Sequence, residues 1–297
     1  MPHHFTTSCP VCNHRKFKAF LTCTDFYATS ETFDIKRCVN CDFLFTQNFP
    51  SESIIGKYYE VQDYISHSDT KKGIVNYLYH LARRYMLKRK ANFVEKVCGS
   101  KEGSLLDFGC GTGYFLYTMH KRGWKSIGVE KSSKGREFAI REFGLQVNDT
   151  SFLSSIADES CEVVTLWHVL EHIEDLEGLL TQLKRVLKPN GTLILALPNS
   201  ASYDANHYRE YWAAYDVPRH LWHFTTKTIS LLCEKNKLEV VCQKGMPLDA
   251  FYISILSEKN KDSKFAFLRG IYIGFLAYFA SRKDISKQSS VIYVLKK

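Results

Sequence analysis

The chain has 297 residues, of which 45% are hydrophobic and 24% are charged, and its 40 Lys and Arg exceed its 31 Asp and Glu to give a formal net charge of +9. This composition excludes an intrinsically disordered chain, and 16 Gly with 7 Pro exclude a collagen-like repeat. A chain of this length can bury a large core without disulfides, and it predicts one large domain or two smaller ones.

The excess of positive charge is concentrated in one segment. Residues 71–101 contain nine basic residues and a single acidic one, Glu95, so the rest of the chain is nearly neutral. Such a local excess indicates docking of an anionic partner, for which a phosphorylated carrier, a membrane surface and RNA are the alternatives. The basic residues are Lys71, Lys72, Arg83, Arg84, Lys88, Arg89, Lys90, Lys96 and Lys101.

Four of the ten cysteines form two C-x-x-C pairs, Cys9 with Cys12 and Cys38 with Cys41. The first residues lack the basic and apolar regions of a signal peptide, which predicts a cytoplasmic chain in which structural disulfides are rare. Two such pairs can present four thiolates as a tetrahedron. This favours a structural Zn²⁺ over reduced core cysteines or a redox pair.

The residues around the two pairs refine this prediction. Asn13 and Asp42 follow the pairs, and both types tolerate the left-handed backbone of a tight turn around a metal. Cys23 or His14 could replace one ligand. The five remaining cysteines are expected in the core.

The chain is predicted to have three parts: a zinc-ribbon-like module at 1–50, a basic helical segment at 51–103, and a larger domain at 104–297 with an insert at 244–289. Apolar residues recur at helical spacing from Ile74 to Val97. From Ser104 onward, short apolar runs alternate with amphipathic ones, which predicts an α/β fold with a parallel sheet covered on both faces. The predicted strands are 104–108, 125–130, 145–148, 161–167, 191–197, 238–243 and 290–296.

The most apolar segment is 265–280. As a helix it would be about 24 Å long, short of a bilayer core of ~30 Å, and Arg269 interrupts it. We therefore expect a packed helix or an apolar lid over the substrate rather than a membrane span.

A glycine-rich loop follows the strand at 104–108. Gly109, Gly111 and Gly113 alternate before a helix that begins at Tyr114, a pattern that lets the backbone approach an anionic group closely. Glu130 ends the next strand, where a carboxylate can accept both hydroxyls of a ribose. A nicotinamide dinucleotide is the main rival ligand, but Tyr114 stands where the dinucleotide-binding motif has its third glycine.

Other details favour S-adenosylmethionine. Asp107 would repel a pyrophosphate but could anchor an ammonium. The sequence Trp167 to His172 follows the fourth strand, and Leu187 to Gly191 forms the turn into the fifth. Together these motifs resemble the class I S-adenosylmethionine-dependent methyltransferases over residues 98–297. Within that class the chain is similar to small-molecule enzymes with His-Val-Leu-Glu-His after the fourth strand, and to bacterial enzymes that carry a zinc ribbon.

The resemblance implies a Rossmann-like sheet of seven strands with the last antiparallel. It implies that Glu130 binds the ribose, that Asp149 or its neighbour Asn148 lies at the adenine, and that Trp167 lines the methyl site. The loop residues that it assigns to the cofactor are Asp107, Phe108, Gly109, Cys110, Gly111 and Gly113.

Three segments are expected at the carboxyl edge of the sheet, where parallel sheets bind ligands: 167–172, 198–224 and 244–289. An oxygen or nitrogen nucleophile loses a proton during methyl transfer, so a histidine there could act as the base. The candidate catalytic residues are His168, His172 and His220, and the candidate substrate contacts are Tyr215, His223 and Arg219, whose guanidinium could pair with a carboxylate or phosphate.

The predicted function is methyl transfer to a small or carrier-linked metabolite, with O-, N- and C-methylation all open. A zinc-ribbon methyltransferase of ribosomal RNA is the first alternative, since the basic strip 71–101 could bind phosphates. A non-catalytic module that binds S-adenosylmethionine is the second alternative. A nicotinamide oxidoreductase is the third and most distant one. Peripheral membrane contact and any oligomeric state stay open.

Overall fold

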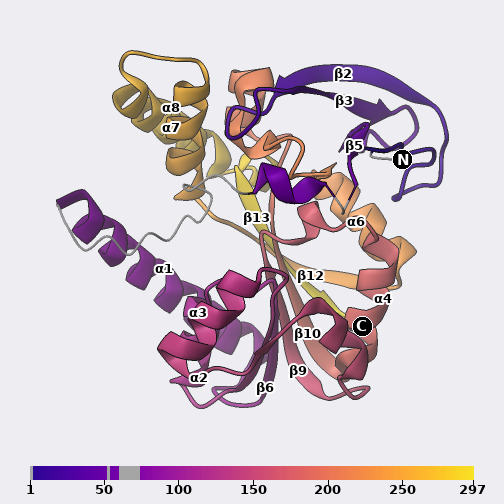
Figure 1. Cartoon of the computed structure of the whole chain (residues 1–297), viewed down its shortest axis with the longest axis vertical. Coiled ribbons are helices and arrows are strands. Elements are labelled where there is room, and N and C mark those ends of the chain that lie inside the picture. Colours follow the sequence, from indigo (N-terminus) through magenta and orange to yellow (C-terminus); the bar gives the residue numbers. More distant parts are fainter. Residues whose placement is uncertain (1–2, 52–53, 60–73) are drawn as a thin grey trace. The chain divides into compact units, whose positions relative to one another are not determined.

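The structure is a computed structural model that describes residues 3–51, 54–59 and 74–297, without the side chains of 74–82 (Figure 1). Lys71 and Lys72 of the predicted basic strip lie outside the described residues. The chain forms two compact units, each described here by itself. The first comprises Met1–Ile65, Leu170–Glu177 and Ala196–Tyr293, and the second Ser66–Val169, Gly178–Leu195 and Val294–Lys297. The predicted domains are continuous segments, and their boundaries stay a prediction.

The predicted α/β sheet is confirmed. Its seven strands have the order β12-β13-β10-β9-β6-β7-β8, with the last strand of the chain antiparallel. Strand β6 pairs in parallel with β7 and β9, and β7 pairs in parallel with β8. The strands are β6 (Ser104–Phe108), β7 (Lys125–Val129), β8 (Val147–Asn148), β9 (Cys161–Trp167), β10 (Leu187–Pro198), β12 (Glu239–Gly245) and β13 (Ser290–Lys296).

Helices cover both faces of the parallel strands. The cores of β6 and β9 are buried almost throughout, as expected for strands with helices on either side. Figure 1 shows α2 and α3 on one side of β6 and β9, and α4 on the other. The helices are α1 (Ile74–Cys98), α2 (Tyr114–His120), α3 (Ser133–Phe143) and α4 (Leu176–Val186), with the short 3-10 helix η2 (Thr150–Ser155) after β8.

One boundary differs from the prediction. The sequence Leu187 to Gly191 was expected to be a turn before the fifth strand, but β10 already begins at Leu187. Lys296 helps to hold this early part, because its Nζ donates to the carbonyl oxygen of Asn190 and lies 2.8 Å from Thr192 Oγ1. The proline and glycine therefore do not end the strand.

The N-terminal segment contains more strands than the two that its sequence predicts, at 29–36 and 43–46. A four-stranded sheet has the order β11-β4-β3-β2, and β1 pairs with β5. Strand β2 was not predicted because buried and exposed positions alternate only weakly along it. Strand β11 was not predicted because it pairs with β4, which is distant in sequence. The strands are β1 (His3–His4), β2 (Phe17–Thr24), β3 (Thr32–Cys38), β4 (Leu44–Thr46), β5 (Phe49–Pro50) and β11 (Trp222–His223).

The long link after β10 is structured rather than open. It contains helix α5 (Tyr203–Tyr208), the 3-10 helices η4 (Arg209–Tyr211) and η5 (Ala213–Tyr215), and then β11. Helix α6 (Thr226–Lys235) follows, and a capping box formed by Thr225 and Thr228 fixes its first turn. Near the N-terminus, η1 (Ile55–Tyr58) belongs to the same unit.

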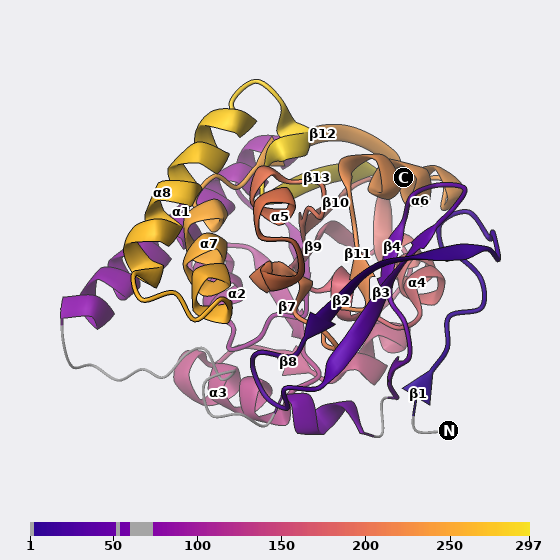
Figure 2. The same cartoon turned by 90° about the horizontal axis from the view of Figure 1, so that it is seen from above.

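The insert before the last strand holds a helical hairpin, α7 (Asp249–Asn260) and α8 (Ala266–Ser281), followed by η6 (Ile285–Lys287). Figure 2 shows the two helices side by side. The helix predicted at 265–280 is confirmed as α8, while its role as a lid stays a prediction. Among the residues that the structure describes, no helix has the length and apolar character needed to span a membrane.

Candidate active site

The glycine-rich loop takes the shape that its residues require. Gly109 and Gly111 adopt φ values of +74° and +56°, a left-handed conformation that favours glycine. A Cβ on Gly109 would lie 2.4 Å from Cγ2 of Val169, so a side chain there would displace the end of the segment after β9. A Cβ on Gly111 would meet nothing within 4 Å. The loop therefore packs on one side and leaves open space on the other.

Asp107 is buried at the carboxyl end of β6. It is 2% exposed, and the hydroxyl of Thr165 on the adjacent strand donates to its Oδ1 at 2.6 Å. Burial raises the pKa of the Asp107 carboxyl to about 7, although the Thr165 hydrogen bond and the charge of Lys90 act in the opposite direction. A buried carboxyl with such a pKa would gain most from a cation brought next to it.

Glu130 fixes the loop from the end of the next strand. Its two carboxylate oxygens accept hydrogen bonds from the backbone amides of Gly111 and Ser132, each at 2.8 Å. A carboxylate has about four acceptor sites, so both oxygens retain capacity for further donors such as hydroxyls. The guanidinium of Arg136 donates to the Glu130 carbonyl oxygen and holds the following turn.

Lys90 joins this site, although the sequence analysis assigned it only to the basic strip. Its Nζ lies 4.4 Å from the centre of the Trp167 ring, a cation–π contact, and its charge acts on Asp107. Phe115 packs edge-on against the same ring at 5.2 Å. The sequence of α1 does not mark Lys90 off from the other basic residues of the strip.

The adenine-side candidates differ from each other in the structure. Asp149 is exposed, and its Oδ1 caps η2 by accepting from the backbone amide and hydroxyl of Ser151. The Nδ2 atom of Asn148 is buried and has no hydrogen-bond partner within the described part of the chain. Asn148 is therefore the better placed of the two for a buried ligand atom.

The glycine-rich loop also contains Phe108 and Cys110. Their side chains are buried, and their backbones form part of the loop.

Two of the candidate catalytic histidines lie together in the first unit. The rings of His172 and His220 meet edge to face with centres 4.5 Å apart. Nδ1 of His172 lies 3.0 Å from the Arg219 carbonyl oxygen and 3.2 Å from the Tyr59 hydroxyl, and Nδ1 of His220 lies 2.9 Å from the Ala214 carbonyl oxygen. Because carbonyl oxygens only accept, each Nδ1 carries a proton, and Nε2 of His220 lies 3.9 Å from Oδ2 of Asp216.

The electrostatics of this pair keep His172 neutral. Burial, and secondly the charge of His220, lower the pKa of His172 to about 4. The carboxylate of Glu171 forms a group with His172 and His220 in which the possible metal-binding atoms all lie within 4.8 Å of one another, close enough for one metal ion to bridge them.

The third candidate histidine, His168, lies in the second unit, where it is half-buried and has a φ of +57°.

The three predicted substrate contacts are buried in the first unit. Tyr215 is 3% exposed and packs at 5.1 Å against His223, whose Nε2 lies 3.0 Å from the Thr46 hydroxyl. Arg219 is 1% exposed. Its guanidinium donates to the carboxylates of Asp216 and Asp25 and to the Tyr58 carbonyl oxygen. These contacts favour a structural role for Arg219 over the predicted contact with an anion.

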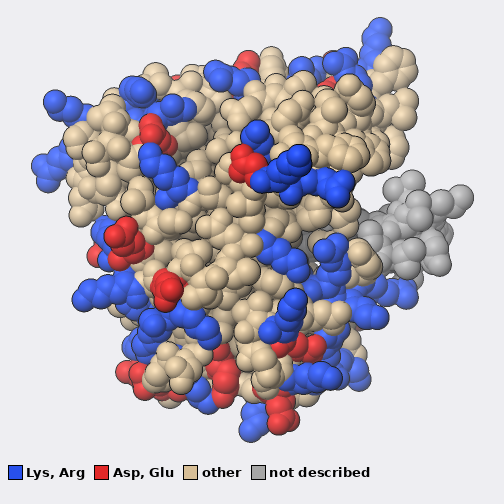
Figure 3. Space-filling model, turned by 180° about the vertical axis from the view of Figure 1, so that it is seen from behind, with Lys and Arg blue, Asp and Glu red and all other residues tan. Residues whose placement is uncertain are grey.

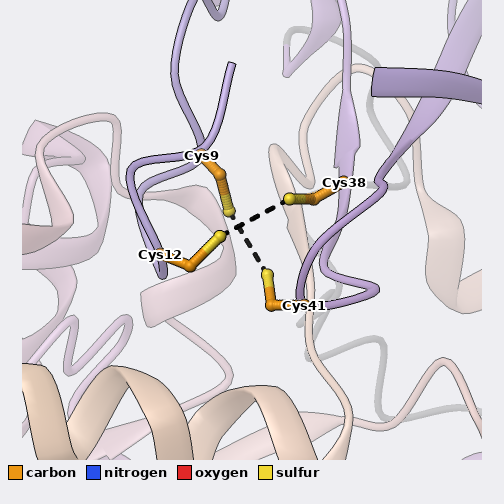
Figure 4. A group of neighbouring side chains, drawn as sticks. All are labelled: Cys9, Cys12, Cys38 and Cys41. Atoms are coloured by element: carbon orange, nitrogen blue, oxygen red, sulfur yellow. Dashed lines mark hydrogen bonds between the residues drawn. The ribbon is translucent and has the colours of Figure 1, made fainter. Parts of the chain in front are cut away.

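The four predicted zinc ligands point toward a common centre (Figure 4). Cys9 and Cys41 have Sγ atoms 3.6 Å apart, and those of Cys12 and Cys38 are 3.5 Å apart. Four sulfurs at ~2.3 Å around one Zn²⁺ would be separated by about 3.8 Å, close to these distances. Asn13 and Asp42 adopt φ values of +59° and +65°, as expected for tight turns.

The other cysteines and histidines that were considered do not join this cluster. Cys23 is buried on β2 among apolar residues, and His14 is absent from the group of ligand atoms found among the described residues. Of the five cysteines expected in the core, Cys242 is exposed on β12, and the expectation for it was wrong. Cys242 lies on an exposed position of a strand whose burial alternates.

Comparison with known proteins decides the family. A family model described as a methyltransferase domain matches residues 77–243, more than half of the chain. The chain belongs to this methyltransferase family. The expectation of a class I S-adenosylmethionine-dependent methyltransferase, drawn from the loop motifs, is confirmed.

Curated relatives of this methyltransferase match part of its length. One, named ubiquinone biosynthesis O-methyltransferase, from Pasteurella multocida, is 28% identical over 127 residues, which is 37% of this chain and 52% of the relative. A protein of the same name from Histophilus somni is 30% identical over 112 residues, 34% of this chain and 47% of the relative. The chain thus spans about half the length of these relatives.

Solved structures share the fold of the methyltransferase. A geranyl diphosphate C-methyltransferase from Streptomyces coelicolor A3(2) gives a TM-score of 0.54 at 16% identity, covering 80% of this chain and 85% of that one. A SAM-dependent methyltransferase from Archaeoglobus fulgidus gives a TM-score of 0.50 at 19% identity, covering 72% and 94%.

The residues of the second unit of the methyltransferase fit S-adenosylmethionine. The space beside Gly111 is open, and Asp107 is a buried acid suited to an ammonium group. Two buried donors, Asn148 Nδ2 and Trp167 Nε1, have no hydrogen-bond partner within the described residues. Buried donors are nearly always paired, so these atoms suit a ligand that supplies acceptors.

Proposed function

We propose that this methyltransferase transfers a methyl group from S-adenosylmethionine to a small or carrier-linked acceptor. The observation that carries the proposal is the arrangement of Asp107, Glu130 and the glycine loop, which offers an anionic contact, hydroxyl acceptors and open space within one unit. The names of the relatives, ubiquinone biosynthesis O-methyltransferases, support a small organic acceptor and favour an oxygen nucleophile.

In this proposal the loop and its neighbours hold the cofactor. Asp107 faces the ammonium, Glu130 accepts from the ribose hydroxyls, and Asn148 with Asp149 contacts the adenine. The open space beside Gly111 lets the cofactor approach the backbone of the loop closely, with Lys90 supplying positive charge nearby. When bound, the cofactor supplies an electrophilic methyl group on a sulfonium, so the protein needs mainly to align the acceptor and exclude water.

His172 and His220 are proposed as the groups that take a proton from the acceptor. Their Nδ1 protons are held by backbone carbonyl oxygens, which leaves Nε2 of the neutral His172 as an acceptor. The low pKa of His172 keeps that ring neutral at neutral pH, so it can accept a proton without first losing one. His168 is the third candidate, because it follows β9 directly.

The four cysteines are proposed to hold a structural Zn²⁺. All four positions of a tetrahedron are then filled by protein ligands, which leaves none for water or substrate. The ion would stabilise the two turns and take no part in methyl transfer.

Calorimetry tests cofactor binding. In the free protein Asp107 is protonated below about pH 7, whereas a bound ammonium favours the ionised form. We therefore expect the affinity for S-adenosylmethionine to fall as pH decreases below 7, by up to about tenfold per pH unit. Asp107→Asn should bind weakly with little pH dependence, and Glu130→Ala should also lose affinity.

Glu137→Gln is the matched control, because Glu137 is an exposed acid on α3. Tight binding by both Asp107→Asn and Glu130→Ala, or an affinity of the parent that is flat between pH 5.5 and 8, would show that the loop has been assigned the wrong role.

A kinetic comparison tests the histidine pair. The acceptor is first found by mass spectrometry of a cell extract incubated with the protein and methyl-labelled cofactor. With that acceptor, His172→Ala is expected to lower kcat by about 10²–10⁴-fold, while cofactor affinity stays the same. The exposed residue His120 provides the control His120→Ala. A kcat within twofold of the parent in both His172→Ala and His220→Ala would remove the pair from the mechanism.

A further inference from the structure

Helix α8 buries small residues and exposes large apolar ones, which is the opposite of a helix on the surface of a water-soluble protein. Such a helix normally buries its large apolar residues and exposes polar ones. In α8 the buried positions include the small residues Gly270, Gly274, Ala277 and Ser281, together with Ile273. The large apolar residues point outward and are between 49% and 66% exposed; they are Phe267, Leu268, Tyr272, Phe275 and Phe279.

The small residues bring α8 into close contact with α7. A Cβ on Gly270 would lie 2.5 Å from the Cα of Ile255, and one on Gly274 would lie 2.6 Å from Cδ1 of Phe251. The two glycines are four residues apart, the G-x-x-x-G spacing that is common where helices pack against each other in lipid. No larger side chain fits at either position without separating the helices.

The inner side of the hairpin carries buried polar residues beside the apolar Ile253 and Ile273. Ser257 is fully buried, and its hydroxyl oxygen accepts from the Ala213 amide at 2.9 Å. Glu258 is 1% exposed and accepts from the Tyr208 hydroxyl at 3.2 Å, while Nε of Arg269 lies 3.4 Å from its second oxygen. Several polar groups therefore lie inside, and large apolar groups face outward.

Basic residues surround this apolar surface. Seven occur between residues 249 and 289, against four acidic ones, of which Glu258 is buried and paired. In Figure 3 the surface over α7 and α8, at the upper right, is mostly tan with blue atoms along its edges. The basic residues are Lys259, Lys261 and Lys264 at the turn between the helices, Arg269, and Arg282, Lys283 and Lys287 beyond the end of α8.

We propose that the α7–α8 hairpin docks the protein on the surface of an anionic phospholipid bilayer. The exposed side chains of α8, from Phe267 to Phe279, enter the boundary between head groups and acyl chains, and the helix lies in the plane of the membrane. The lysines and arginines at both ends bind lipid phosphates, which supplies the charge complementarity. This docking is independent of the proposed methyl transfer.

Vesicle flotation of the full chain tests the proposal. The protein is mixed with vesicles of phosphatidylcholine alone, or with one third phosphatidylglycerol, at low and at high salt. We expect flotation with the anionic vesicles and at least about tenfold weaker binding to the neutral ones or at high salt. Equal binding to both kinds of vesicle would overturn the assignment to anionic lipid, and so would no binding to either.

Substitutions locate the contact. Leu268→Ser/Tyr272→Ser/Phe279→Ser removes three outward-facing side chains and is expected to weaken vesicle binding at least about tenfold with an unchanged thermal unfolding temperature. The matched control, Ile140→Ser/Val241→Ser, removes exposed apolar side chains from α3 and β12 and should bind like the parent. If the control loses binding and the triple variant keeps it, the hairpin is not the docking site.

Two further measurements separate membrane docking from a protein interface. Phe275→Trp places a fluorophore on the exposed face, and its emission should shift to shorter wavelength with anionic vesicles and be quenched by brominated acyl chains. Light scattering gives the oligomeric state of the parent and the triple variant. A parent that forms dimers, fails to bind vesicles and becomes monomeric in the triple variant would show that a second copy covers this face.

Discussion

Cys38→Ser is expected to yield a chain that retains no zinc and in which the segment around both C-x-x-C turns no longer folds. The sulfur atoms of the four cysteines already lie close to tetrahedral spacing, so one lost ligand breaks a site that is otherwise complete. The free energy of binding structural zinc is on the order of 10–16 kcal/mol in small zinc modules, and it acts as folding free energy because the unfolded chain has no such site.

The loss should extend beyond the two turns. Lys235 at the end of α6 donates to the Pro10 carbonyl oxygen at 3.0 Å and lies 3.2 Å from the Asn13 side chain. Lys227 at the start of α6 forms an ion pair with Asp42. Helix α6 should therefore become more dynamic when the turns loosen, and hydrogen exchange of its amides should increase.

Metal analysis and thermal unfolding measure this effect. The parent is expected to carry about one zinc ion per chain and Cys38→Ser close to none. Cys242→Ser, which removes an exposed thiol on β12, is the control and should keep the ion. Unchanged zinc content in Cys38→Ser would reject the four-cysteine site, and a parent without zinc that unfolds at the same temperature with and without a chelator would reject a structural role.

Local sequence patterns were sufficient to predict much of this molecule. The strands of the parallel sheet were predicted because each is a short run of apolar residues, and both faces of such strands are buried. The four cysteines were predicted because metal ligands sit at short, fixed spacing in tight turns. Gly109 and Gly111 could be recognised because their backbone conformation nearly demands glycine.

The parts that were not predicted depend on contacts between distant residues. Strand β11 is two residues long and exists only because it pairs with β4, more than half the length of the chain away in sequence. Lys90 was counted as one charge among nine, since nothing in its own helix reveals that its ammonium lies over Trp167.

The predicted substrate contact of Arg219 has an alternative within the chain. The position of Arg219 in a long aromatic link predicted a contact with an anionic group of the substrate. In the structure its guanidinium donates to two carboxylates of the chain itself, those of Asp25 and Asp216. Asp25 is separated from Arg219 by 194 residues and directly follows β2, a strand that was not predicted. The Asp25 carboxylate also accepts from the amides of Tyr27, Ala28 and Thr29, so one buried group ties a turn to the arginine.

Arg219→Met is therefore expected to lower the free energy of unfolding by about 3–5 kcal/mol, the usual cost of removing one partner of a buried ion pair. The side chains of Arg219 and Asp25 are 1% and 0% exposed, so water cannot replace the lost guanidinium. Arg141→Met, which breaks the exposed pair with Glu142, is the control and should change stability by less than about 1 kcal/mol. Unfolding in urea, followed by circular dichroism, measures both.

The pH dependence gives this prediction a second readout. Burial alone would raise the pKa of Asp25, but the hydrogen bonds and charge of Arg219 outweigh it and hold the pKa below its ordinary value of 3.8. A lowered pKa in the folded state means that the stabilisation is present above the ordinary value and is lost as the pH falls toward the folded value. The parent should thus lose stability below about pH 4, and Arg219→Met should lose less, because its Asp25 is no longer held ionised.

A double-mutant cycle decides between this role and contact with a substrate. If Arg219 serves the ion pair, Arg219→Met and Asp25→Asn should be strongly non-additive, and the double variant should be more stable than the sum of the single losses implies. If Arg219 instead binds an anionic acceptor, Arg219→Met should unfold at the same urea concentration as the parent and raise KM for the acceptor. Additive losses with unchanged KM would contradict both roles, since the arginine would then matter only for packing.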